Sequence, residues 1–305
     1  MPRLWSILES GNPSRTTAMI VDFHTHIVPP FLKEQREEYL ARDATLAALF
    51  ADPASPMATA DELVAAMDAA GIDRAVVLGM GWTDRTLARQ VNDYLLESAD
   101  RYRDRLIPFC SVNPAWGDEA VREAERCARL GARGIGELHP DTQGFDITSP
   151  QVMDPIMETV RRLGMLLLTH SSEPVGHRYP GKGATTPDVL LGLIQRYPDV
   201  PIVCAHWGGG LPFYNLMPEI RGTLQNSYFD SAASSYLYQP EIFSIATGLV
   251  GAKHILFGSD YPLLSPERAM RQVTDQPLAE AEKRAILGDN AQRLLGLSGE
   301  TDGRG

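Results

Sequence analysis

The sequence has few cysteines and no long apolar run. Its three cysteines, Cys110, Cys127 and Cys204, are too few and too scattered for a disulfide framework or a CxxC zinc site, so we expect buried free thiols. No segment approaches the length of a transmembrane helix, and the N-terminus lacks the apolar region of a signal peptide. We therefore expect a protein of the reducing cytoplasm that has no membrane partner.

Positive charge is also scarce. The chain carries 28 Lys and Arg against 39 Asp and Glu, a formal net charge of −11. A field of this sign repels polyanions, and no basic stripe interrupts it, which argues against a nuclease or any other nucleic-acid partner. A GxGxxG motif is absent after the first predicted strand, which disfavours an open dinucleotide-binding sheet.

Eight short apolar or β-branched runs recur along the chain and alternate with segments of helical periodicity. The runs are Ile20–His24, Arg74–Leu78, Leu106–Val112, Gly134–Leu138, Met165–His170, Pro201–His206, Asn226–Asp230 and His254–Gly258. They are too short for helices and are bounded by turn residues, which predicts buried parallel strands. Strands that alternate with helices in this way predict an α/β fold, a single-domain (β/α)8 TIM barrel.

The helical segments carry recognisable start signals. Thr59 and Glu62 form a capping box before one helix that Gly71 ends, and Thr186-Pro187 begins another. Further helices are expected over 84–100, 118–130, 150–163, 240–250 and 278–287. We predict an N-terminal extension over residues 1–18, the barrel over 19–297 and a tail over 298–305. The longest irregular insertion, Pro29 to Pro56, follows the first strand and is expected to cover the barrel mouth.

Six potential metal ligands occur at or just after the ends of predicted strands. In the stretch VDFHTH, His24 and His26 project from one face because side chains alternate along a strand. The others are Glu137, His170, His206 and Asp260. In a barrel the carboxyl ends of the strands meet on one face, where active sites are built. Imidazole and carboxylate ligands predict a divalent metal, with Zn²⁺ favoured.

Five segments carry a resemblance to a known family. VDFHTH, GIGELHP, LLLTHSSEPVGHRYPGKG, IVCAHWGGGLPFY and ILFGSDYPLLSPER, in this order, resemble the amidohydrolase superfamily, and specifically its amidohydrolase-related (family 2) barrels, over residues 19–297. The resemblance implies that His24, His26 and Asp260 bind a first ion and that His170 and His206 bind a second. It also implies a homo-oligomer.

Glu137 separates the subtypes that this resemblance implies. Two-metal members carry a bridging carboxylate or carboxylated lysine at this position, whereas members related to aminocarboxymuconate-semialdehyde decarboxylase use one ion and lack the bridge. Glu137 therefore favours a hydrolase of a small amide, lactone or ester-like bond, with a metal-activated hydroxide whose proton Asp260 accepts. With one ion only, His206 would serve as general acid or base instead.

Two other functions stay open on the sequence. A non-oxidative decarboxylase of an aromatic or unsaturated carboxylic acid would use His206 or Asp260 to protonate carbon. A non-catalytic barrel would bind metal without turnover.

The loop that follows the fifth strand supplies candidate substrate-binding residues. They are Glu173, His177, Arg178, Tyr179 and Lys182, to which His139 and Trp207 are added from neighbouring strand ends. Arg178 and Lys182 are expected to receive an anionic group of a small-molecule substrate, Arg by a bidentate contact. The alternative is that both are solvated surface cations.

Overall fold

Eight parallel strands form the centre of the computed structural model, which describes residues 18–297. Each strand pairs with the next in chain order, from β1 to β8. Their bounds are β1 Val21–His26, β2 Arg74–Leu78, β3 Leu106–Cys110, β4 Gly134–Leu138, β5 Leu166–Thr169, β6 Ile202–Cys204, β7 Ser227–Asp230 and β8 Ile255–Leu256. All eight strands fall where the sequence predicts them, and the (β/α)8 barrel is confirmed.

The first and last strands close the ring. The backbone N–H of Phe23 donates to the carbonyl of Phe257 at 2.7 Å, and that of Asp260 donates to the carbonyl of His24 at 2.8 Å. These bonds hold the loop after β8 against β1. The closure therefore places Asp260 beside the two histidines of the first strand, although they are far apart in the sequence.

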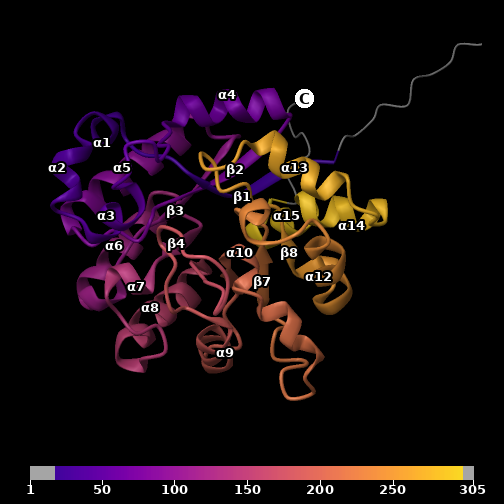
Figure 1. Cartoon of the computed structure of the whole chain (residues 1–305). Coiled ribbons are helices and arrows are strands. Elements are labelled where there is room, and N and C mark those ends of the chain that lie inside the picture. The colour runs from indigo at the N-terminus through magenta and orange to yellow at the C-terminus, as the bar shows by residue number, and fades with distance from the viewer. Residues whose placement is uncertain (1–17, 298–305) are drawn as a thin grey trace, which may run out of the picture.

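Helices surround the strands on all sides visible in Figure 1. The longer ones are α4 Ala60–Ala70, α5 Arg85–Arg101, α6 Asp118–Arg129, α8 Pro150–Leu163, α9 Pro187–Arg196, α12 Ile242–Val250 and α13 Pro266–Thr274. The shorter α14 Glu280–Arg284 and α15 Asn290–Leu295 follow α13. The capping box at Thr59 and Glu62 is present, and Gly71 ends α4 in the left-handed conformation. Among residues 18–297, no helix is both long and apolar enough to cross a membrane.

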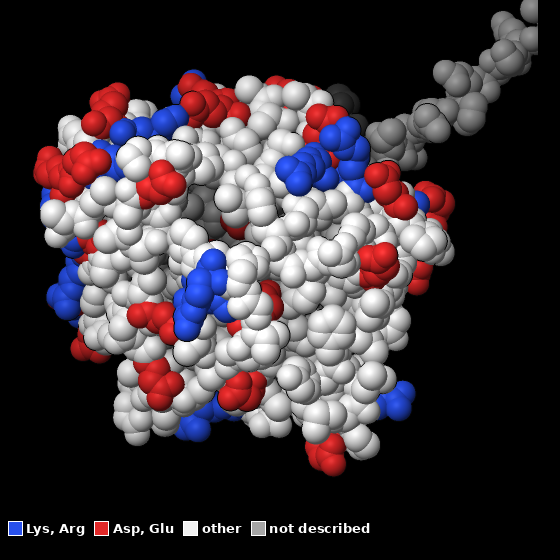
Figure 2. Space-filling view, viewed as in Figure 1, with Lys and Arg blue, Asp and Glu red and all other residues white. Residues whose placement is uncertain are grey.

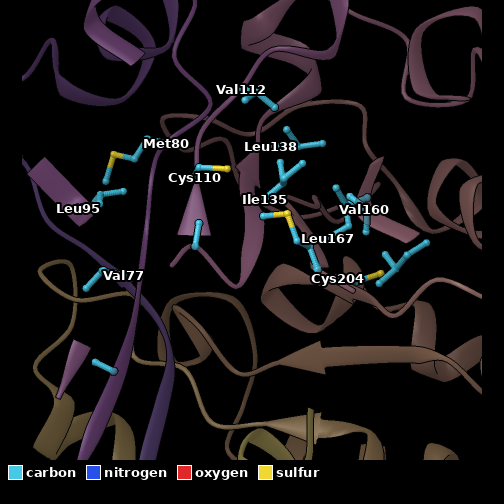
Figure 3. Close-up of a cluster of buried hydrophobic side chains, with 14 of the residues drawn as sticks. Val77, Met80, Leu95, Cys110, Val112, Ile135, Leu138, Val160, Leu167 and Cys204 are labelled. Atoms are coloured by element: carbon cyan, nitrogen blue, oxygen red, sulfur yellow. The ribbon is translucent and has the colours of Figure 1, made fainter. Parts of the chain in front are cut away.

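The apolar core has two parts. The larger part lies between the strands and the surrounding helices, and Figure 3 shows Ile135, Leu138 and Leu167 within it. In the smaller part, Phe23 of β1 meets Phe109 of β3 edge to face, with ring centroids 5.9 Å apart. Because β1 and β3 are not neighbours in the sheet, these rings meet across the barrel interior, which is filled and not a pore.

The insertion after β1 folds into three short helices, although the sequence pattern indicates an irregular segment. They are α1 Pro30–Glu34, α2 Arg36–Leu40 and α3 Ala44–Phe50. Asp43 caps α3 by accepting from the backbone of Leu46 and also accepts from the backbone of Thr83 and Asp84 after β2. This carboxylate ties the insertion to the barrel rim, where it does cover the mouth. The extension predicted over 1–18, except Ala18, and the tail over 298–305 lie outside the described residues.

Candidate active site

A cavity of about 290 Å³ opens where the carboxyl ends of the strands converge. Figure 2 shows this face hollowed near its centre, with most of the bordering residues white. The cavity floor holds His26, Glu137, His139, His170, His206 and Asp260. Its size is near the lower end of small-molecule sites, which suits a small ligand.

The two histidines of β1 form one side of the floor. Their Nε2 atoms lie 3.0 Å apart, and both side chains are buried. The Nδ1 of His24 lies 2.8 Å from the carboxylate of Asp230 on β7. A proton on Nδ1 directed at Asp230 leaves the lone pair of Nε2 facing the cavity floor, the arrangement typical of a metal-ligating histidine.

Glu137, at the end of β4, lies between two pairs of histidines. Its Oε1 is 3.0 Å from the Nδ1 of His170 and 3.5 Å from the Nε2 of His206. Its Oε2 is 3.6 Å from the Nε2 atoms of both His24 and His26. One carboxylate thus faces the β1 histidines with one oxygen and the β5 and β6 histidines with the other.

The donor atoms on the floor fit a divalent cation. Two groups have ligand atoms that all lie within 4.8 Å of one another: His24, His26 and Asp260, and His24, Glu137 and His206. Imidazole nitrogen and carboxylate oxygen are the ligands that Zn²⁺, Mn²⁺ and related ions accept. The residues present therefore match a metal centre in both number and chemistry.

The electrostatics of the floor favour an added positive charge. Burial alone would lower the pKa of His24, but Asp230 and Glu137 raise it well above its ordinary value. Burial opposes ionisation of Asp260, yet the neighbouring histidines lower its pKa to about 2. Burial also disfavours the charged form of His206, but Glu137 and Asp260 raise its pKa to about 9. Buried carboxylates are thus balanced by protonated imidazoles, a balance that a divalent ion can supply instead.

Strained backbone is concentrated at this floor. Among the described residues, His206, Trp207, Ala233 and Asp260 are the non-glycine positions with positive φ, between 53° and 64°. Three of them line the cavity. Such conformations cost roughly 1–3 kcal/mol each and persist at functional sites where the surroundings enforce them. The strain aims His206 and Asp260 into the cavity although they lie beyond the ends of their strands.

His139 lies beside the metal-type cluster without a polar partner among the described residues. Its ring stacks on that of His170, with centroids 4.1 Å apart, and neither ring nitrogen has a hydrogen-bond partner. Burial, followed by the neighbouring His170, lowers its pKa to about 3, so the imidazole is neutral. A buried neutral imidazole that lines a cavity can donate one hydrogen bond and accept another from a bound molecule.

The loop after β5 places its predicted binding residues in different environments. His177 and Tyr179 line the cavity. Glu173 is buried behind it and accepts a hydrogen bond from the Tyr179 hydroxyl at 3.0 Å. Lys182 donates to the carbonyls of Val175 and His177, so its ammonium group is used within the loop. Arg178 is exposed and, like Glu173 and Lys182, does not line the cavity, so the expected contact of Arg178 and Lys182 with an anionic group stays a prediction that the lining does not support.

Trp207 does not line the cavity either. Its indole N–H donates to the hydroxyl of Ser234 at 2.8 Å, and its ring packs edge to face against Phe243. The side chain is fully buried because the strained turn at His206 directs it away from the floor. Its role in the described structure is packing under the site.

Several residues that shape the site carry no motif. Asp230 ends β7 and also accepts from the backbone N–H of His206 at 2.9 Å, so it holds two floor histidines. Its place at a strand end is the signal that could have identified it. The apolar wall, with Leu49 and Phe50 of α3 and Leu263 after β8 among its members, comes from separate segments whose approach no local pattern indicates.

Comparisons with known proteins place the chain among relatives of one type. The family model described as Amidohydrolase matches residues 21–297. The chain is 26% identical over 241 residues to 2-amino-3-carboxymuconate-6-semialdehyde decarboxylase of Dictyostelium discoideum, covering 69% of this chain and 67% of the relative. It is 27% identical over 245 residues to 6-methylsalicylic acid decarboxylase of Penicillium expansum, covering 68% and 74%.

Solved structures share the fold at lower identity. A 5-carboxyvanillate decarboxylase from Novosphingobium aromaticivorans, complexed with manganese and 4-hydroxy-3-methoxy-5-nitrobenzoic acid, has a TM-score of 0.76 at 20% identity, covering 92% of this chain and 96% of that one. A dihydroxybenzoic acid decarboxylase from Polaromonas, with manganese and 2-nitroresorcinol, has a TM-score of 0.71 at 21% identity, covering 92% and 98%.

These comparisons correct the main functional prediction. The relatives are decarboxylases, so the prediction of a hydrolase from Glu137 is wrong, and the alternative is the better supported. The physical reason is that a ligand set fixes where metal-type chemistry occurs, whereas the bond that breaks depends on how the cavity orients a substrate.

Proposed function

This chain belongs to the amidohydrolase family, and from that premise we propose that it is a metal-dependent, non-oxidative decarboxylase of an aromatic carboxylic acid. The observation that carries the proposal is the cavity itself, in which a floor of histidines and carboxylates lies beneath an apolar wall. The relatives with that activity support it.

We assign the metal to the floor. His24, His26 and Asp260 would hold a divalent ion, and Glu137, His170 and His206 offer donors for a second. When bound, the ion supplies positive charge that attracts the substrate carboxylate and polarises the adjacent ring. Zn²⁺ stays a prediction, since the two solved neighbours contain manganese.

The reaction requires one proton at carbon. The bond between the ring carbon and the carboxylate breaks, its electron pair stays on the ring carbon, that carbon takes a proton, and carbon dioxide leaves. We assign proton delivery to His206 and Asp260, because both side chains line the cavity and both are held in place by strained backbone. The carbonyl of Ala232, 3.2 Å from the Nδ1 of His206, further fixes that ring.

The chain's other cavity residues would orient the substrate. His139 offers a neutral donor and acceptor to an oxygen next to the carboxylate. Tyr179 presents its ring, because its hydroxyl is bonded to Glu173. Both His177 and Tyr179 close the side of the cavity near the loop. Homo-oligomerisation stays a prediction, to be checked by gel filtration over a wide concentration range.

A panel of hydroxybenzoic, methylsalicylic and methoxybenzoic acids tests the proposal. Wild-type protein loaded with Mn²⁺ or Zn²⁺ is expected to release carbon dioxide from at least one acid, and Asp260→Asn is expected to lose this activity with its circular dichroism unchanged. Metal bound at one or two equivalents with no carbon dioxide from any acid would instead support the non-catalytic barrel.

A further inference from the structure

We infer that the substrate is a monocarboxylic acid with an apolar far end, and that the wall of the cavity disfavours a second carboxylate. The inference rests on the proposed function and names the substrate class of the same site. It follows from how polar and apolar side chains are separated within the cavity.

Depth separates the two kinds of lining. The titratable side chains of the floor are almost all deeply buried, with His139 2% and Glu137 6% exposed. Towards the opening the lining becomes apolar, and Tyr236 and Leu263 are 49% and 46% exposed at the rim. Leu49, Phe50, Met80 and Leu237 complete the apolar lining, and Phe50 and Met80 are as buried as the floor. A flat ring with its carboxylate on the floor would therefore direct its far side at carbon atoms.

Cations are missing from this wall. Within residues 18–297, no Lys or Arg lines the cavity. Above the floor, His177 contributes a basic side chain to the lining. A carboxylate placed against apolar side chains loses its hydration without a compensating partner. Proteins that recognise a carboxylate commonly supply an Arg in bidentate contact. The wall therefore favours a methyl or similar substituent over a second acid group.

The two cations of the loop after β5, Lys182 and Arg178, do not supply a positive charge to the cavity wall in the structure. The ammonium group of Lys182 donates to two loop carbonyls and lies over the ring of Tyr179. Arg178 is exposed and outside the cavity lining. Figure 2 shows basic side chains on the surface beside the hollow, so the test must ask whether one of them turns inward.

Two compounds in which a nitro group replaces the reacting carboxylate separate binding from turnover. In 4-hydroxy-3-methoxy-5-nitrobenzoic acid the nitro group has the planar shape of the reacting carboxylate and a second carboxylate remains; 2-methoxy-4-methyl-6-nitrophenol replaces only that second carboxylate by methyl. Their dissociation constants are measured by calorimetry on Mn²⁺-loaded protein whose metal content has been verified. We expect the methyl compound to bind at least tenfold more tightly.

A rim substitution supplies the missing cation. Leu263→Arg is chosen because Leu263 is half exposed, so an Arg there is compatible with folding. We expect it to tighten binding of the nitrobenzoic acid at least tenfold and not to tighten binding of the methyl compound, because only the acid carries a charge that the Arg can pair. Leu263→Gln, which is polar but uncharged, is the control and should not tighten binding of the acid.

Two results would overturn the inference. Equal or tighter binding of the acid by wild-type protein would do so while leaving the proposed function standing. If that binding disappeared in Arg178→Ala or His177→Gln, the loop would be the source of the missing partner. Failure of both compounds to bind metal-loaded protein would remove the aromatic-acid function itself, and the inference with it.

Discussion

At the scale of single residues, Asp230 shows how a side chain that touches no cavity can control the floor. Its Oδ2 fixes the Nδ1 of His24, while its Oδ1 accepts from the backbone N–H groups of His206 and Ala232. In Asp230→Asn the oxygen can keep the backbone bonds, but the amide N–H₂ would face His24 and favour the tautomer with a proton on Nε2. Such outer partners are worth about 10–100-fold in metal affinity.

We therefore expect Asp230→Asn to weaken metal binding by about 10–100-fold. The measurement is a competition titration with a metal indicator, with circular dichroism to confirm the fold. Asp141→Asn is the matched control, because this carboxylate also accepts from a loop backbone but does not contact the floor histidines. Unchanged metal affinity in Asp230→Asn would show that His24 needs no orienting partner.

Substitutions of His206 and of Asp260 should differ in how they change metal content and turnover. Asp260 belongs to the donor group with His24 and His26, so Asp260→Asn should lower both metal content and activity. His206→Asn should keep at least one equivalent of metal and lose about 10²–10⁴-fold in kcat, the range for general acid catalysis. Elemental analysis and initial rates on the same preparations provide the check. Loss of all metal from His206→Asn would contradict this division.

The site residues that could be predicted from the sequence and those that could not differ in what determines their position. His24, His26 and Glu137 stand at strand ends, and a closed barrel must bring such ends together, so their meeting could be predicted. The path of the loop after β5 depends on tertiary contacts, so nothing in its sequence showed that Lys182 would bond to its own loop. Predicting an anion contact from its charge was therefore unsafe.

At the scale of elements, cap residues define where helices begin. The Thr59 hydroxyl accepts from the backbone N–H of Glu62, and the Glu62 carboxylate accepts from the backbone N–H of Thr59. Thr59→Ala should lower the free energy of unfolding by about 1 kcal/mol, as N-cap losses typically do. Thr186→Ala is the comparison, because Thr186 precedes α9 without accepting from the helix backbone, although its hydroxyl donates to Asp188. Denaturant unfolding should show a smaller loss for Thr186→Ala; equal losses would contradict the capping argument.

His254 lies between β7 and β8 and predicts a pH dependence of stability. Its Nδ1 lies 3.0 Å from the carbonyl of Ser227, and burial lowers its pKa. The unfolded chain then binds the proton more readily, so stability is full above the unfolded pKa of about 6.5 and falls as pH decreases through it. The melting temperature of metal-free protein should drop less between pH 7.5 and 5.5 in His254→Gln than in wild type. An equal drop would mean that other groups dominate this window.

Local sequence signals predicted the boundaries of strands and most helices, but they did not predict the helices of the insertion after β1. Strands and most helices begin and end at residues with intrinsic turn or cap preferences, which the sequence displays. In contrast, α1, α2 and α3 are short, and Asp43, which caps α3, also accepts from backbone groups that follow β2. Helices this short are not stable alone, and a linear pattern does not contain the tertiary contacts that support them.

At the scale of the whole molecule, the barrel could be predicted and the reaction could not. Alternation of eight strands with helices leaves few architectures, whereas the same barrel hosts many chemistries. Glu137 favoured hydrolysis only when its ligand chemistry was considered alone. The wall that shapes the substrate space combines Phe50 of α3, Met80 after β2 and Leu237 of α11 (Ser234–Leu237), and this combination exists only in the folded chain.

Metal removal should therefore affect the whole molecule and not only the site. The floor donors come from β1, from β4, from the residues just after β5 and β6, and from the loop after β8, so the unfolded chain cannot present them together. An ion that binds only the folded chain adds about 2.7 kcal/mol of stability at a concentration of 100 times its dissociation constant. Chelation should lower the melting temperature and abolish turnover, and added Mn²⁺ or Zn²⁺ should restore both. In Asp260→Asn the added metal should raise the melting temperature much less. If the wild-type melting temperature is the same with and without metal, despite verified loading, the ion also binds the unfolded chain or the donor cluster is not its site.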